Sequence, residues 1–151
     1  MIFIRRAFQL VIAFCMVSAT ASFAAESADK PYEPVVGQAG KDTVWVPTPA
    51  SLVDKMLDLA KVTPQDYVMD LGSGDGRNVI AAAKRGARAH GVEYNPDMVE
   101  LSRRAAAKEG VADKATFSQG DMFEADISQA NVMALFLLPD QVCDKLLDDL
   151  A

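Results

Sequence analysis

The hydrophobic positions of this chain change their period along the sequence, and the changes predict alternating strands and helices. Short apolar runs bounded by glycine or proline predict buried strands over residues 66–71, 87–93, 115–120 and 132–137. Apolar positions at helical spacing predict helices over residues 51–60, 77–84 and 96–109. Because helix-length segments connect successive strands, we expect an α/β fold with a doubly wound, mostly parallel sheet.

The N-terminal residues have a different pattern from the rest of the chain. Arg5 and Arg6 precede an apolar stretch, and residues 7–25 carry no charge. This pattern predicts, over residues 1–24, a signal peptide cleaved after Ala24, with an uncleaved membrane anchor or a mitochondrial presequence as alternatives. The expected location is therefore exported, periplasmic or membrane-anchored, and an anchor leaves open that the domain faces the cytoplasm.

A polar segment with several prolines and glycines follows the leader. It contains few apolar positions at either regular period, so residues 25–43 are predicted to be a linker and residues 44–151 the folded domain. At 151 residues, of which half are hydrophobic, the chain has material for one domain.

Charge and cysteine content exclude several kinds of site. The formal net charge is −6, which disfavours nucleic acid as a partner. Of the two cysteines, Cys15 lies in the leader and Cys143 has no partners at metal-ligand spacing, so neither an internal disulfide nor a metal site is expected. His90, the single histidine, is interpreted as structural.

The chemistry-bearing residues gather in a glycine-rich turn after the first predicted strand. A dinucleotide-binding G-x-G-x-x-G motif that begins at Gly72 needs glycine at position 77, where this chain has Arg77. Asp70 and Asp75 would repel a pyrophosphate but suit the ammonium and sulfonium groups of S-adenosylmethionine. We interpret Arg77 as a solvated helix residue rather than one that pins the loop. The residues of this turn predicted to bind the cofactor are Asp70, Gly72, Ser73, Gly74 and Gly76.

Two further strand ends carry acidic residues that suit the adenosine part of this cofactor. Glu93 ends the second predicted strand, where a carboxylate accepts hydrogen bonds from ribose hydroxyls; a solvated strand-end acid is the alternative. Tyr94 or Asn95 is expected to lie along the adenine ring. After the third strand, Asp121 is expected to face the adenine amino group and Met122 the ring, although an aspartate after glycine is also a common turn.

These segments resemble the class I S-adenosylmethionine-dependent methyltransferases. Residues 70–76 resemble the first motif of that class, Glu93 its ribose-binding acid and Asp121 its adenine-side acid. Residues 72–86, 91–96 and 102–111 resemble a narrower group, the bacterial relatives of the mitochondrial protein-lysine methyltransferases that act on the c ring protein of ATP synthase and on the adenine nucleotide translocase. The Val-Pro-Thr-Pro sequence at 46–49 also resembles this group. The resemblance implies a Rossmann-like fold, S-adenosylmethionine as methyl donor and protein-lysine methylation.

The chain departs from the resemblance near its C-terminus. Methyltransferases of this class continue for three strands beyond the fourth, so we expect a sheet truncated after the fourth strand, with the C-terminal part of the domain missing and an exposed strand edge. Asp140, just after the fourth strand, is a candidate substrate contact; the alternative is an acid at a helix N-terminus. The expected partner is a protein lysine or a small molecule, with membrane association through the N-terminal segment. A small-molecule methyltransferase and a non-catalytic cofactor-binding or interaction fragment are the other functions considered.

Overall fold

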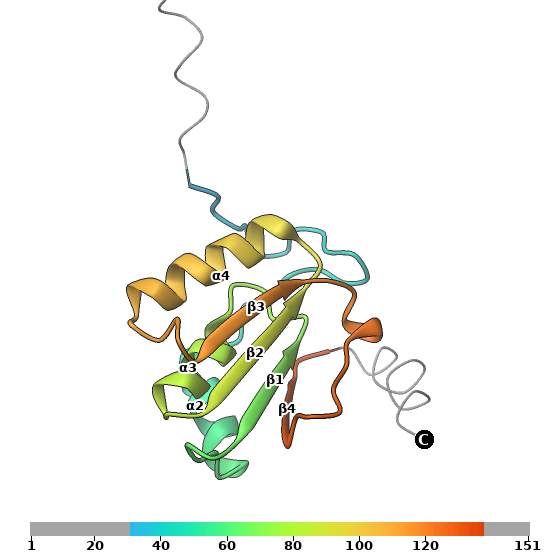
Figure 1. Ribbon diagram of the computed structural model, residues 1–151. Helices are drawn as coiled ribbons and strands as arrows, with labels where there is room; N and C mark the ends of the chain where they lie inside the picture. Colours follow the sequence, from blue (N-terminus) through green and yellow to red (C-terminus); the bar gives the residue numbers. More distant parts are fainter. Residues whose placement is uncertain (1–30, 138–151) are drawn as a thin grey trace, which may run out of the picture. The chain divides into compact units, whose positions relative to one another are not determined.

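The computed structural model describes residues 31–137 (Figure 1). Its helices are α2 (Ala50–Leu59), α3 (Arg77–Lys84), α4 (Pro96–Lys108) and the short 3₁₀ helix η1 (Met122–Glu124). Its strands are β1 (Tyr67–Leu71), β2 (Arg88–Glu93), β3 (Ala115–Gln119) and β4 (Val132–Leu135). Each predicted helix and strand is found, with bounds that differ from the prediction by at most two residues at either end.

The four strands form one parallel sheet in the order β3-β2-β1-β4 (Figure 1). Asp70 of β1 is in register with Gly91 of β2 and with Ala134 of β4. The chain therefore leaves β1 for β2 on one side and later returns to place β4 on the other, which makes the C-terminal end of β1 the switch point of the sheet. This Rossmann-like topology confirms the predicted fold class.

The larger hydrophobic core lies between the sheet and the helices. It joins buried residues of α2, α3 and α4 to Val68 of β1, Ala89 of β2 and Phe117 of β3. Several positions at the helix–sheet contacts are alanine, including Ala82 and Ala106, which are completely buried. Because alanine side chains are small, the helix backbones pack close to the strands. The loops that join the strands to the helices are therefore held close to the edge of the sheet.

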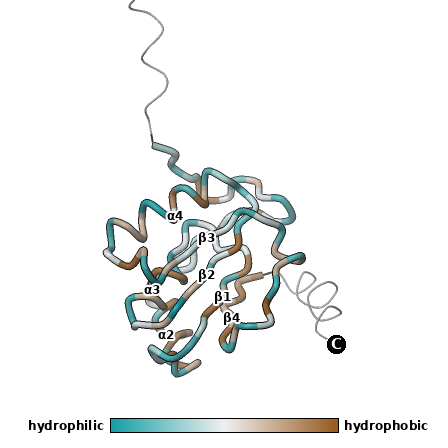
Figure 2. The backbone as a smooth tube through the Cα atoms, in the orientation of Figure 1, coloured by the Kyte–Doolittle hydropathy of each residue, from teal (hydrophilic) through white to brown (hydrophobic). Residues whose placement is uncertain are grey.

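A smaller core covers the opposite face of β1. It contains Met69, Leu71 and Val92, packed against apolar residues of η1 and of the segment that follows it, such as Met122 and Ile127. Figure 2 shows β4 as a continuous hydrophobic run beside β1. Within residues 31–137, β4 pairs only with β1, so its second edge has no strand partner in this part of the chain.

Three sequence-based predictions fall outside the described residues. They are the leader over 1–24, the candidate Asp140 and any structure after residue 137. Among residues 31–137, no helix has both the length and the hydrophobicity that crossing a membrane requires.

One close contact in the sheet gives a test of the fold. A Cβ atom at Gly91 would lie 2.6 Å from Ser73 Oγ and 2.9 Å from Phe117 Cδ1. Gly91→Ala should therefore lower the free energy of unfolding by about 1–3 kcal/mol, because the added methyl group would overlap two buried side chains. At the control position Gly120, the nearest atom to an added Cβ is Val92 Cγ1 at 3.7 Å, an ordinary contact. Urea unfolding followed by Trp45 fluorescence measures both variants; equal midpoints would contradict the packing described.

Candidate functional site

A cavity of about 420 Å³ lies at the C-terminal edge of the sheet. Its walls come from five separate segments of the chain: residues 38–48, the turn after β1, the turn after β2, the turn after β3 and the end of β4. Open parallel α/β sheets bind ligands at this edge, beside the switch point. The fold therefore places the cavity where a ligand is expected.

The glycine loop forms the floor of the cavity. Gly72, Gly74 and Gly76 have φ angles of +77°, +55° and +78°, a region that favours glycine. A Cβ at Gly74 would lie 2.7 Å from Trp45 Nε1, and one at Gly76 would lie 2.7 Å from the Phe117 ring. Side chains are thus excluded at both positions by neighbours as well as by backbone conformation.

Glu93 ties the loop to the turn after β2. One carboxylate oxygen accepts a hydrogen bond from the Gly74 N–H and the other from the Asn95 N–H, each at 2.9 Å. On the other side of the loop, the buried Ser102 hydroxyl donates to the Gly74 carbonyl at 3.0 Å. The predicted ribose-binding acid therefore also holds the cavity floor in shape.

Asp70 is buried behind the loop rather than in the cavity wall. It is 2 % exposed, and its carboxylate accepts a 3.1 Å hydrogen bond from Asn78 Nδ2. Burial raises the pKa of Asp70 to about 7; the Asn78 hydrogen bond opposes this shift, and the charges of Glu93 and Asp75 add to it. Asp70 thus titrates near neutral pH in the folded protein.

The interpretation of Arg77 as a solvated residue was wrong. Its guanidinium donates to the Asp75 carboxylate through Nε at 2.9 Å and Nη2 at 2.5 Å, and to the Thr48 carbonyl through Nη1 at 2.7 Å. Arg77 therefore pins the glycine loop to the segment before α2, and it balances the charge of Asp75. The sequence gives no sign of the Thr48 contact because the two residues are far apart along the chain.

Part of the segment predicted as a linker lines the cavity. Gly37 N–H donates to the Trp45 carbonyl at 2.8 Å and Trp45 N–H to the Gln38 carbonyl at 2.9 Å, which makes residues 37–45 a small hairpin. Gly40 N–H closes its tip on the Thr43 carbonyl at 2.8 Å. Two glycines around a short polar stretch before a tryptophan were the sequence signal for this turn.

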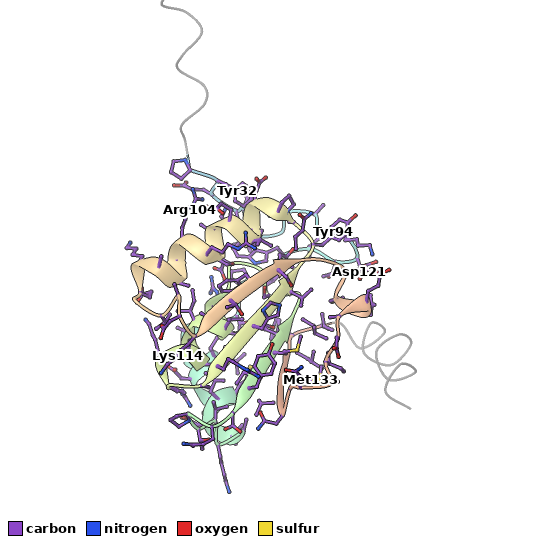
Figure 3. All side chains as sticks on the ribbon, viewed as in Figure 1. Tyr32, Tyr94, Arg104, Lys114, Asp121 and Met133 are labelled. Atoms are coloured by element: carbon purple, nitrogen blue, oxygen red, sulfur yellow. The ribbon has the colours of Figure 1, made fainter. Side chains whose placement is uncertain are left out.

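The hairpin reaches across the cavity through Lys41. Its ammonium forms an ion pair with Asp121 and lies 5.1 Å from the centre of the Tyr94 ring. The hydrogen bond and charge of Asp121 raise the pKa of Lys41. The other oxygen of Asp121 accepts from the Phe123 N–H at 3.1 Å. Figure 3 shows Tyr94 and Asp121 on the same side of the fold, after β2 and β3.

Most of the predicted cofactor-binding residues meet in the cavity. Those that line it are Gly72, Ser73, Gly74, Glu93, Tyr94, Asn95, Asp121 and Met122. Asp70 and Gly76 lie outside its wall, Asp70 buried behind the loop and Gly76 packed on Phe117 and Ser102. Among residues 31–137, no set of three His, Cys, Asp or Glu side chains converges as metal ligands.

Two buried polar side-chain atoms within the described part of the chain have no hydrogen-bond partner. They are Ser73 Oγ and Asn78 Oδ1, and both residues line the cavity. A buried polar atom without a partner costs about 1–3 kcal/mol. A ligand with a polar group that reaches this position would recover that free energy.

Comparison with known proteins identifies the family. Residues 70–151 match the family described as the ANTKMT methyltransferase domain. The chain belongs to this family. A protein-lysine N-methyltransferase of Saccharolobus islandicus is 45 % identical over 96 residues, covering 62 % of this chain and 60 % of that protein. A human lysine N-methyltransferase, named for the C component of ATP synthase, is 36 % identical over 98 residues, covering 65 % of this chain and 42 % of that protein.

A solved structure of a methyltransferase has the same fold. The Salinibacter ruber protein, described as an RNA methyltransferase in complex with S-adenosyl-L-homocysteine, superposes with a TM-score of 0.65 at 51 % identity, covering 69 % of this chain and 70 % of that one. These findings confirm the class I methyltransferase resemblance. The chain spans 42 to 60 % of the length of the two lysine methyltransferases named above.

The buried carboxyl of this methyltransferase domain predicts a pH-dependent stability. Folding raises the pKa of Asp70 from an ordinary value of about 3.9 to about 7, so the folded state holds a proton that the unfolded state releases between these values. The stability from this group is complete below about pH 4 and is lost as the pH rises to 7. Asp70→Asn removes the titration.

Denaturation at several pH values measures this effect. Relative to Asp70→Asn, the wild-type protein should lose on the order of 3 kcal/mol between about pH 4 and pH 8. A difference that stays constant with pH would show that Asp70 is ionised in the folded protein throughout.

Proposed function

We propose that this chain binds S-adenosylmethionine in the cavity and transfers its methyl group to a lysine of a protein. The observation that carries the proposal is that eight of the residues predicted from the sequence to bind this cofactor line one cavity at the switch point of the sheet. The family and its lysine-methylating relatives support the choice of reaction.

The cavity residues suit the adenosine part of the cofactor. Each Glu93 oxygen accepts one backbone N–H and keeps a further lone pair, so ribose hydroxyls can donate to it as well. Tyr94 offers an aromatic face and Met122 an apolar one for the adenine ring, and Asp121 offers an acceptor for its amino group.

The methionine part of S-adenosylmethionine suits the part of the cavity beside Ser73 and Asn78. Its ammonium is a donor for the unpartnered Asn78 Oδ1, and its carboxylate is an acceptor for the Ser73 hydroxyl. When bound, S-adenosylmethionine supplies an electrophilic methyl group. The chain's contribution is to orient it, because displacement at a sulfonium requires nucleophile, methyl carbon and sulfur in line.

The two residues that follow β4 provide an apolar wall for the methyl acceptor. Phe136 and Leu137 line the cavity, and Phe136 is 52 % exposed. A lysine side chain has an aliphatic stem that packs on such a surface and an amine that must approach as the neutral nucleophile. Asp140, the predicted substrate contact, lies outside the described residues and remains a prediction.

RNA is the competing acceptor, because the Salinibacter ruber protein is described as an RNA methyltransferase. The net charge of −6 weighs against it, since affinity for a nucleic-acid backbone comes mainly from lysine and arginine. The names of the Saccharolobus, human and mouse relatives all specify lysine. The mouse protein is an adenine nucleotide translocase lysine N-methyltransferase. It is 35 % identical over 106 residues, which cover 70 % of this chain and 45 % of that protein. We therefore favour a protein lysine.

Membrane targets and location remain part of the proposal. The uncharged segment over residues 7–25 supports export or anchoring by the N-terminus, and the names of the human and mouse relatives specify ATP synthase and adenine nucleotide translocase. Fractionation of cells that express the full chain, with detection of residues after 25, tests this directly.

Calorimetric titration with S-adenosylhomocysteine tests the cofactor site, with NAD as the parallel ligand. We expect saturable binding of the first and none of the second. Gly74→Val should abolish binding by forcing Trp45 out of the cavity wall, and Glu93→Ala should weaken it at least about tenfold through the lost ribose and loop contacts. Glu100→Ala, an exposed acid on α4, is the matched control. Wild-type affinity in both site variants would overturn the site.

Methyl transfer from isotopically labelled S-adenosylmethionine tests the acceptor. The purified chain is incubated separately with membrane proteins, total RNA and a small-molecule extract, and labelled proteins are hydrolysed to detect methyl-lysine. We expect label in methyl-lysine. Label in RNA or in small molecules would replace the proposed acceptor, and cofactor binding without transfer to any of the three would identify a non-catalytic binding fragment.

A further inference from the structure

Lys41 occupies an unusual place for a residue at the tip of a polar hairpin. Its ammonium pairs with the Asp121 carboxylate and lies over the Tyr94 ring, and all three residues line the cavity. The Lys41 side chain is 37 % exposed and that of Asp121 19 %. Lys41 thus bridges two walls of the cavity from a third segment of the chain.

These two contacts are the ones that the proposed function assigns to adenine. The adenine amino group is a donor that needs the Asp121 carboxylate, and the ring needs the face of Tyr94. One oxygen of Asp121 already accepts from the Phe123 N–H, and Lys41 holds the other. The lysine and an adenine ring therefore require the same donor position and the same aromatic face.

We propose that Lys41 is an internal competitor of the cofactor, which holds the adenine contacts of Asp121 and Tyr94 until adenine displaces it. This inference rests on the proposed cofactor site. Lys41 thereby sets the affinity for adenosine-containing ligands, and it does so without taking part in methyl transfer.

The rest of the hairpin explains why displacement involves only the Lys41 side chain. The hairpin base is held by the backbone hydrogen bonds between Gly37, Gln38 and Trp45. The following segment is held by the Arg77 contact to the Thr48 carbonyl. A lysine has four rotatable bonds in a flexible stem, so its head can leave Asp121 while the hairpin stays in place.

The ion pair also argues against Lys41 as a methyl acceptor within its own chain. The Asp121 contact keeps its amine protonated, whereas methyl transfer needs a free lone pair on nitrogen. Its position beside Tyr94 and Asp121 belongs to the adenine end of the site rather than to the wall that follows β4. Lys41 is accordingly expected to remain unmethylated.

Titration of Lys41→Met with S-adenosylhomocysteine tests the proposal. Methionine keeps much of the stem but cannot pair with a carboxylate, so we expect about three- to tenfold tighter binding than in the wild-type protein. Lys41→Arg keeps the charge and can bind Asp121 through two hydrogen bonds, so it should bind no more tightly than the wild type. Lys55→Met removes an exposed lysine of α2 and controls for the change in net charge.

Ionic strength provides an independent readout. Raising salt from about 0.01 to about 0.1 M shortens the Debye length from roughly 30 to roughly 10 Å and weakens an exposed ion pair. The wild-type affinity for S-adenosylhomocysteine should rise over this range, and that of Lys41→Met should stay constant.

The outcomes separate this inference from the proposed function. Equal or weaker binding by Lys41→Met, or the same gain in Lys55→Met, overturns the role of Lys41 and leaves the cofactor site intact. If S-adenosylhomocysteine binds to Lys41→Met but not to the wild-type protein, the result supports strong competition. If it binds to neither the wild-type protein nor Lys41→Met, the result overturns the cofactor site and this inference together.

Discussion

The cavity depends on the close contact between the glycine loop and the strand beside it. Gly91 has no side chain, so Ser73 lies directly on β2, and Gly76 has none, so α3 begins against the Phe117 ring. This contact sets the distance between the loop and Glu93, which then binds both the Gly74 and Asn95 amides. Without it, the loop would stand away from β2 and the turns after β1 and β2 would not form one wall.

The three acidic residues around the loop are each compensated in a different way. Asp70 is buried beside Asn78 and takes up a proton near neutral pH. Asp75 pairs with Arg77, whereas Glu93 accepts hydrogen bonds from two backbone amides. From the sequence alone, Asp70 and Asp75 are equivalent free anions beside the ligand. Of these three carboxylates, Glu93 is the one that lines the cavity and forms no ion pair within residues 31–137.

The sequence was sufficient for features that depend on local order. Strand and helix positions follow from hydrophobic period, and the glycine loop follows from residues whose backbone conformation few others adopt, such as Gly72 and Gly76. Glu93 was predictable because it ends a strand next to the switch point. Contacts between distant segments were not: the Arg77 bond to Thr48 and the Lys41 pair with Asp121 join residues 29 and 80 positions apart. A polar hairpin has no hydrophobic period, so its role in the cavity leaves no trace in the pattern.

The hairpin also changes which residue is the first one needed for a complete ligand site. Hydrophobic periodicity begins near α2, and a minimal domain chosen on that basis would start at about residue 44. Such a protein would keep every residue of both hydrophobic cores, since neither core includes a residue of the hairpin. It would nevertheless lack Lys41 and most of the wall that residues 38–48 provide. The residues that complete the two hydrophobic cores therefore begin later in the chain than the residues that complete the cavity.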